Sequence, residues 1–201
     1  MLAYNPIIVT RDNYIIDGQH RLQVAKTLRV PIHYTVIEKG DLQTIILLNT
    51  AMRKWGFSDY LHAYISLGNP HYMKLDAFAK EYASKKISLR MCIGILANEE
   101  ISKEAFAHGN FTVIQSDDMA RKIVSFIIET RKYMQDIDFS SSRDYVRAVI
   151  TIFHRIDTNE ILRRLELYGM KILPKASKKG YLREFEDILN FRNSKNFMRI
   201  Y

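Results

Sequence analysis

The chain has a single cysteine, Cys92, and no long apolar segment. One cysteine excludes an internal disulfide framework and any zinc site built from several cysteines. The longest apolar runs are short, such as IILL at residues 45–48, whereas a membrane-crossing helix needs about 20 apolar residues. The first residues, MLAYNP, have neither the basic region nor the apolar stretch of a signal peptide. These absences predict a cytoplasmic protein without a membrane span.

Acidic residues are also scarce relative to basic ones. The chain has 22 Asp and Glu against 30 Lys and Arg, a formal net charge of +8. Residues 171–201 contain eight Lys or Arg and three Asp or Glu, a net charge of +5. Such a balance favours a polyanionic partner. Two interpretations of the basic end stay open: a solvated tail and a surface that contacts nucleic acid.

The first 38 residues have the pattern strand, turn, strand, helix, strand. Two β-branched stretches, PIIVT and YIID, flank the turn RDN, which predicts a hairpin. Apolar residues at helical spacing follow from Leu22, and Asp17 is the expected N-cap of that helix. Pro31 ends the helix, and IHYTVIE then alternates like a strand.

From Gly40 onward, apolar residues recur at helical spacing, which predicts an almost entirely helical region. Ser58, Asn69 and Ser88 are expected to cap helices there. We therefore predict an α+β fold, in which a small mixed-sheet unit precedes a larger, mostly helical region. The expected domains are 1–57 for the α/β unit, 58–112 for a helical region, and 113–201 for a helical region with a basic end.

The stretch DGQHR lies where the hairpin becomes a helix, and its chemistry suits a phosphate. The first turn of a helix has N–H groups without intrahelical partners and the positive end of the dipole, so it stabilises an anion. Gly18 allows close approach of the backbone, and Arg21 can donate two parallel hydrogen bonds. His20 and Gln19 can donate further bonds. The alternative is an ordinary turn in which Asp17 caps the helix and competes with an anion.

The segment NPIIVTRDNYIIDGQHRLQVAKTLRVPIHYTVIE closely resembles the ParB/sulfiredoxin superfamily. Domains of that superfamily have a strand, a Gly-x-x-Arg turn, a helix of the form GxxRxxAxxxL and a strand that begins near proline. The matching positions are Gly18, Arg21, Ala25, Leu28 and Pro31, and the resemblance covers roughly residues 4–60. The resemblance implies that Gly18, Gln19, His20 and Arg21 bind the phosphates of a nucleotide. The resemblance leaves the cofactor open, with a nucleoside triphosphate and Mg²⁺ as the candidate.

The sequence departs from the family in three places. The sulfiredoxin branch has a cysteine where Gln19 stands, so sulfiredoxin activity is not expected. The partition-protein branch has a second motif, Glu-Asn-x-x-Arg, and the stretch LLNTAMRKW occupies a similar place. Arg53 matches the arginine of that motif, so the resemblance implies that it is a further phosphate ligand. Asn49 and Thr50 replace its Glu and Asn, so a carboxylate for Mg²⁺ is missing there. Family domains also begin with a further strand and helix, which we expect to be absent here or replaced.

Partition proteins have a DNA-binding helix-turn-helix after the nucleotide domain, and KLDAFAKEYASKKISLRMCIGILANEE occupies that position. Ser88 and Arg90 are the expected DNA contacts on its second helix. That helix is otherwise rich in apolar residues, whereas base readout needs polar side chains. A buried helix hairpin is therefore the preferred interpretation of this stretch.

Aromatic and basic residues alternate at the basic end of the chain. The expected DNA contacts are Arg183, Arg192, Lys195 and Arg199. The aromatic residues beside them, on which bases could stack, are Tyr181, Phe185, Phe191, Phe197 and Tyr201. An amphipathic helix with a frayed basic end has the same pattern and is the preferred interpretation.

Three classes of function follow from these features. The first is a DNA-associated ParB-like protein, of the sort found on plasmids, phages and mobile elements, in which a phosphate at the turn biases DNA binding. The second is a nuclease or nucleotide-dependent phosphotransferase, with Asp17 or His20 as acid or base and Arg21 stabilising phosphoryl charge. The third is a helical interaction protein that retains the turn only as a scaffold.

The expected partners follow from the first class. They are DNA and a nucleotide, without a membrane, and a homodimer is a possible assembly. No histidine pair has the spacing of a zinc site, so no metal ligands are predicted.

Overall fold

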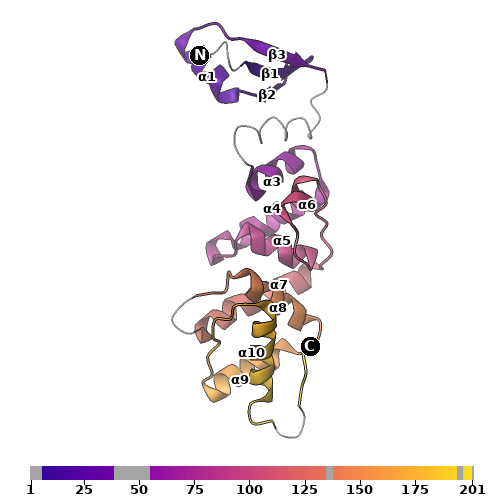
Figure 1. Ribbon diagram of the computed structural model, residues 1–201, viewed down its shortest axis with the longest axis vertical. Helices are drawn as coiled ribbons and strands as arrows, with labels where there is room; N and C mark the ends of the chain where they lie inside the picture. The colour runs from indigo at the N-terminus through magenta and orange to yellow at the C-terminus, as the bar shows by residue number, and fades with distance from the viewer. Residues whose placement is uncertain (1–5, 39–54, 135–137, 194–196, 201) are drawn as a thin grey trace. The chain divides into compact units, whose positions relative to one another are not determined.

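The computed structural model describes residues 6–38, 55–134, 138–193 and 197–200 (Figure 1). The chain divides into two compact units, Met1–Ala63 and Tyr64–Tyr201, here called the N-terminal unit and the helical unit. The division falls within helix α3 (Phe57–Ser66) and near the predicted boundary at 57. The helical unit continues through the second predicted boundary, at 112.

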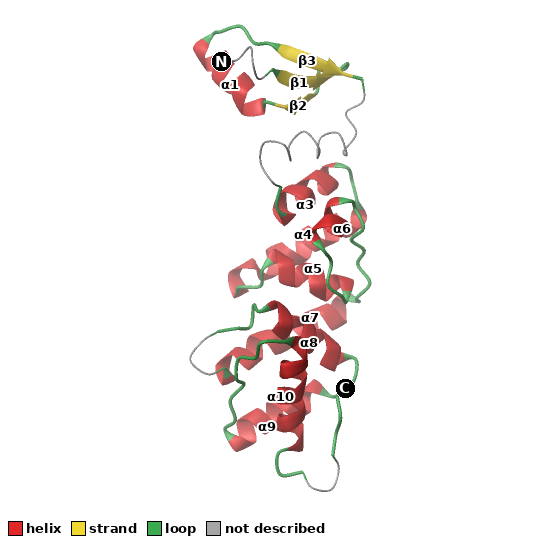
Figure 2. Ribbon diagram, in the orientation of Figure 1, coloured by secondary structure: helices red, strands yellow, loops and turns green. Residues whose placement is uncertain are grey.

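The N-terminal unit contains a three-stranded mixed sheet (Figure 2). Its elements are β1 (Ile7–Thr10), β2 (Ile15–Asp17), α1 (Gln19–Leu28) and β3 (Tyr34–Ile37). The central strand β1 pairs antiparallel with β2 and parallel with β3, so that Ile7 lies opposite Tyr34. The predicted order of strand, turn, strand, helix and strand is confirmed.

The buried residues of the N-terminal unit show why these elements pack together. Ile7 and Val9 alternate along β1 and are buried, as is Ala25 of α1. Helix α1 contacts β1, because the small side chain of Ala25 lets the helix approach the sheet closely. The turn that precedes α1 is thereby held against the central strand.

The helical unit is built from short helices joined by short loops. These are α4 (Pro70–Tyr82), η2 (Ala83–Lys85), α5 (Leu89–Ala97), α6 (Lys103–Ala107), α7 (Asp117–Thr130), η3 (Arg131–Tyr133), α8 (Arg143–Phe153), α9 (Thr158–Tyr168) and α10 (Lys178–Asn190). A small mixed sheet followed by a larger helical region is an α+β fold, as predicted. No helix in the described parts of the chain is long and apolar enough to cross a membrane.

Side-chain caps set the starts of most of these helices. Asn69 caps α4, with Pro70 in its first turn, and Ser88 caps α5, as predicted. The prediction for Ser58 is wrong, because α3 already begins at Phe57. The carboxylate of Asp59, in the first turn, accepts from the N–H of Gly56, which precedes the helix, at 2.7 Å.

The core of the helical unit lies among α5, α7, α8 and α10. Helices α8 and α10 lie side by side, and α5 packs against α8 (Figure 1). Phe185 of α10 is fully buried, with its ring 6.0 Å from that of Tyr145 and 6.1 Å from that of Phe126. The buried hydroxyl of Tyr145, on α8, shares a hydrogen bond of 2.6 Å with the Thr130 hydroxyl. The polar group that Tyr145 brings into the core is therefore paired.

Candidate functional site

The turn before α1 differs from the prediction at its first residue. Gly18, not Asp17, is the N-cap, and its φ of 95° and ψ of 20° lie in the left-handed region that favours glycine. Asp17 ends β2, so its expected role as a cap is wrong. No side chain caps α1, and the Gly18 carbonyl accepts the first helical bond from Leu22 at 2.9 Å.

The Asp17 carboxylate forms an ion pair with Arg21 and does not cap the helix. Nη2 of Arg21 lies 2.5 Å from Oδ2 of Asp17, and Nη1 donates to the Pro6 carbonyl at 3.0 Å. The guanidinium is partly buried and fixed against the start of β1. This ion pair joins the last residue of β2 to the first turn of α1 and competes successfully with the capping bond.

The geometry of the turn suits an anion. The first-turn N–H groups have no side-chain cap, and Gln19 and His20 are exposed beside them. A Cβ added to Gly18 would lie 3.0 Å from Ile7 Cγ1 and 3.2 Å from Arg21 Nη2, so the backbone packs closely there. Phosphate oxygens can accept from such N–H groups, and the Arg21 guanidinium adds positive charge beside them.

Three other features matter for chemistry at a nucleotide site: the second predicted arginine ligand, a metal site and a reactive thiol. Arg53 lies outside the described residues. Within the described ranges, no group of three His, Cys, Asp or Glu side chains could hold a metal ion. Cys92 is fully buried in the helical unit, and burial raises the pKa of its thiol to about 12. That thiol is far from being a reactive thiolate at neutral pH.

The expected helix-turn-helix stretch forms α4, η2 and α5. Six of the nine residues of α5 are buried, which confirms the preferred interpretation of a buried helix hairpin. Ser88 accepts from the Met91 N–H as the helix cap, and Arg90 lies 3.7 Å from Glu100. Both side chains remain exposed, and their contact with DNA stays a prediction.

The alternating aromatic residues at the basic end separate into two sets. Tyr181 and Phe185 belong to the core, whereas Phe191 and Phe197 are exposed beyond the end of α10. The Arg192 guanidinium lies over the rings of Phe191 and Tyr168, with centroids at 5.5 and 5.7 Å. The amphipathic interpretation therefore holds for α10, and an exposed aromatic and basic surface follows it. Arg183 and Arg199 are exposed, while Lys195 and Tyr201 lie outside the described residues.

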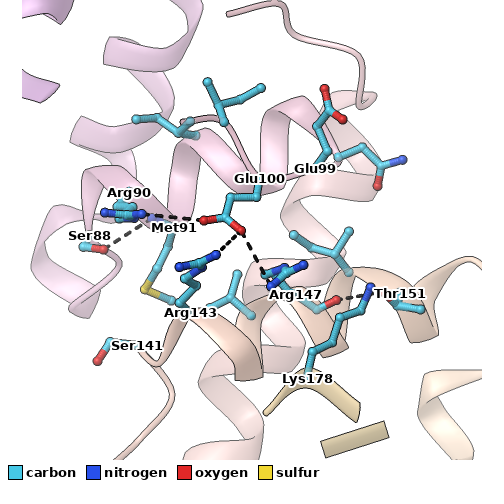
Figure 3. Close-up of a pocket in the computed structure, with 16 residues that line it drawn as sticks. Ser88, Arg90, Met91, Glu99, Glu100, Ser141, Arg143, Arg147, Thr151 and Lys178 are labelled. Atoms are coloured by element: carbon cyan, nitrogen blue, oxygen red, sulfur yellow. Dashed lines mark hydrogen bonds and ion pairs between the residues drawn. The ribbon is translucent and has the colours of Figure 1, made fainter. Parts of the chain in front are cut away.

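The helical unit also contains a cavity of about 260 Å³ that the sequence motifs did not indicate (Figure 3). In it the Glu100 carboxylate lies among three arginines, at 2.6 Å from Arg143, 3.6 Å from Arg147 and 3.7 Å from Arg90. Lys178, at the start of α10, lines the same cavity. Burial, followed by the nearby charges of Arg147 and Arg155, lowers the pKa of this lysine.

Comparisons of the chain with protein-family models, curated proteins and solved structures gave no match. The assignment of a function therefore depends on the geometry and chemistry of the residues described above.

Proposed function

We propose that the chain is a DNA-associated, ParB-like protein that binds the phosphates of a nucleotide or nucleic acid at Gly18–Arg21. The observation that carries this proposal is the start of α1 at a left-handed glycine without a side-chain cap. Because none of the described side chains forms a capping hydrogen bond with the first-turn N–H groups, these groups can donate to an anion. The sequence resemblance to the ParB/sulfiredoxin superfamily supports the same residues.

The Asp17–Arg21 pair supports the proposal in a second way. The pair fixes the arginine at the mouth of the turn before any ligand arrives, which reduces the entropy lost on binding. The carboxylate is also the local charge that opposes an anion. Neutralising Asp17 and neutralising Arg21 should therefore change phosphate affinity in opposite directions.

A nucleotide titration tests this expectation. Labelled CTP and ATP are titrated into the wild-type chain, Arg21→Gln, Asp17→Asn and the control Arg29→Gln, each with and without duplex DNA. We expect Arg21→Gln to weaken binding by about 10- to 100-fold through loss of a charge-assisted hydrogen bond. Asp17→Asn should strengthen binding by about fivefold, because it removes the competing carboxylate. Arg29→Gln removes the same charge at the other end of α1 and should have little effect.

The signs of these changes separate the outcomes. Tighter binding by Asp17→Asn cannot result from a misfolded turn, so it protects the test against a purely structural effect of Arg21→Gln. Equal affinities for all four chains would place the nucleotide elsewhere. No binding by any of them would remove the phosphate site from the proposal, and DNA binding would then be tested on its own.

The exposed basic surface after α10 makes a separate prediction about DNA. Arg192→Gln and Arg199→Gln should each reduce duplex affinity and lower the salt slope by about one unit, as expected for one lost phosphate contact. The measurement is fluorescence anisotropy of labelled duplex at several salt concentrations. Lys122→Gln is the control, because this exposed lysine pairs with Asp118 on α7. Unchanged slopes in both arginine variants would exclude this surface as the DNA contact.

A further inference from the structure

We propose that the cavity lined by α5, α8 and the start of α10 binds a small organic anion, an apolar body that carries one carboxylate or phosphate group. In the free protein, the Glu100 carboxylate occupies the position of that anionic group (Figure 3). This site is independent of the phosphate-binding turn, because all its residues belong to the helical unit.

The first argument is the convergence of charge. Arg90, Arg143, Arg147 and Lys178 line the cavity together with the carboxylates of Glu99 and Glu100, so four cations face two anions and the net charge is +2. Only the Arg143 contact with Glu100 has the length of a charge-assisted hydrogen bond, at 2.6 Å. The other two arginines, at 3.6 and 3.7 Å, are attracted to the same carboxylate but do not bond to it closely.

Lys178 provides a second sign of excess positive charge. Burial of its amine is the main cause that lowers its pKa, and the nearby charges of Arg147 and Arg155 lower it further. None of the described carboxylates lies within ion-pair distance of this amine. An anion bound in the cavity would oppose the contribution of the two arginines by supplying a counter-charge.

The apolar wall indicates what the rest of the ligand is like. Met91, Ile101, Val146 and Ile150 line the cavity beside the charged groups. Apolar walls with a few convergent polar groups are typical of small-molecule sites, and the volume lies just below their usual range of about 300–1,000 Å³. A recessed apolar wall suits a compact ligand with a short chain or a single ring better than it suits the phosphates of a DNA backbone.

The first test uses the full chain and the fluorescent anion 8-anilinonaphthalene-1-sulfonate, an aromatic body with one charged group. We expect one saturable site in the wild type, with binding weakened about tenfold in Arg143→Gln and in Arg147→Gln. Glu100→Gln should bind the probe about tenfold more tightly, because it removes the internal carboxylate that competes for Arg143, while Arg147 keeps its second pair with Asp144 at 3.5 Å. Arg163→Gln, on α9 and paired with Glu160, is the matched control and should bind like the wild type.

A matched set of competitors then identifies the anionic group. Hexanoate and hexyl phosphate should displace the probe, whereas 1-hexanol should not, and the stronger competitor shows whether the site takes a carboxylate or a phosphate. Displacement by all three equally would mean an apolar cavity without anion recognition and would overturn the proposal. Displacement by duplex DNA alone would overturn it in favour of a nucleic-acid surface.

The variants also separate binding from loss of folding. A loosened core takes up the probe more strongly, so misfolding of Arg143→Gln or Arg147→Gln would raise the signal, contrary to the expected loss. If Glu100→Gln and the two arginine variants all bind like the wild type, the ion pairs only join the loop after α5 to α8, and the proposal fails. Near-UV circular dichroism of each variant accompanies the titrations, because a loosened core loses this signal; a native signal from Glu100→Gln shows that its tighter probe binding does not result from loosened packing.

Discussion

Phe185→Ala is expected to lower the free energy of unfolding of the helical unit by about 3–5 kcal/mol. The Phe185 side chain is 0% exposed and packs between the rings of Phe126 and Tyr145, where α8 and α10 meet. Alanine would leave a cavity that two short helices cannot close without breaking their own contacts. Urea unfolding followed by circular dichroism gives the change, with an unchanged slope as evidence that the unfolded state is the same.

Phe197→Ala is the matched control for this prediction. Phe197 is 64% exposed, although the sequence presents it in the same alternation of aromatic and basic residues. Its removal should change stability by no more than about 0.5 kcal/mol. Similar losses in both variants would contradict the division of these aromatics into core and surface sets. If Phe197→Ala weakens DNA binding without loss of stability, base stacking on that surface is supported.

Some features of this fold depend only on residues that are neighbours in the sequence, whereas the contrast between Phe185 and Phe197 depends on where α10 ends. Tyr181 and Phe185, which the sequence presents beside the expected DNA contacts, are four residues apart inside α10 and share its buried face. Asn69 followed by Pro70, and Ser88 before an apolar run, are cap signals whose partners lie within three residues. Signals of this kind need no knowledge of the rest of the chain, so they were predicted correctly.

Two capping predictions failed for different reasons. Asp17 was expected to cap α1, but it ends β2, and its carboxylate pairs with Arg21 in the first turn of the helix. That charge-assisted bond is stronger than the predicted capping bond. Ser58 was expected to cap α3, but the helix begins at Phe57, so Ser58 lies inside its first turn.

The arginine-lined cavity could not be predicted because its residues come together only in the tertiary structure. Glu100 lies in the loop after α5, Arg143 and Arg147 are on α8, and Lys178 begins α10. Each residue alone has the appearance of an ordinary surface charge. Their convergence depends on the packing of α5 and α10 against α8, and no spacing within the sequence encodes that arrangement.

Gly18→Ala tests the turn that carries the proposed function. We expect it to destabilise the N-terminal unit by about 2–3 kcal/mol, because alanine is strained at a φ of 95° and its Cβ would press on the buried Ile7 side chain. Among residues 6–38 only Ile7, Val9 and Ala25 are buried, so little other packing offsets this loss. Amide exchange of β1 and α1 in the full chain, followed by mass spectrometry, should become about 30- to 160-fold faster.

Gly68→Ala separates the two causes of that effect. Gly68 also has a positive φ, 74°, but nothing lies within 4 Å of the Cβ that alanine would add. It should therefore show the backbone strain alone, about 1 kcal/mol. If both substitutions have equal effects, the close approach to Ile7 contributes nothing, and Gly18 is needed only for its conformation.

If saturating CTP restores slow exchange in Gly18→Ala, the strained turn still binds phosphate. Failure of CTP to protect this variant, where it protects the wild type, would show that the glycine conformation and the anion site depend on each other.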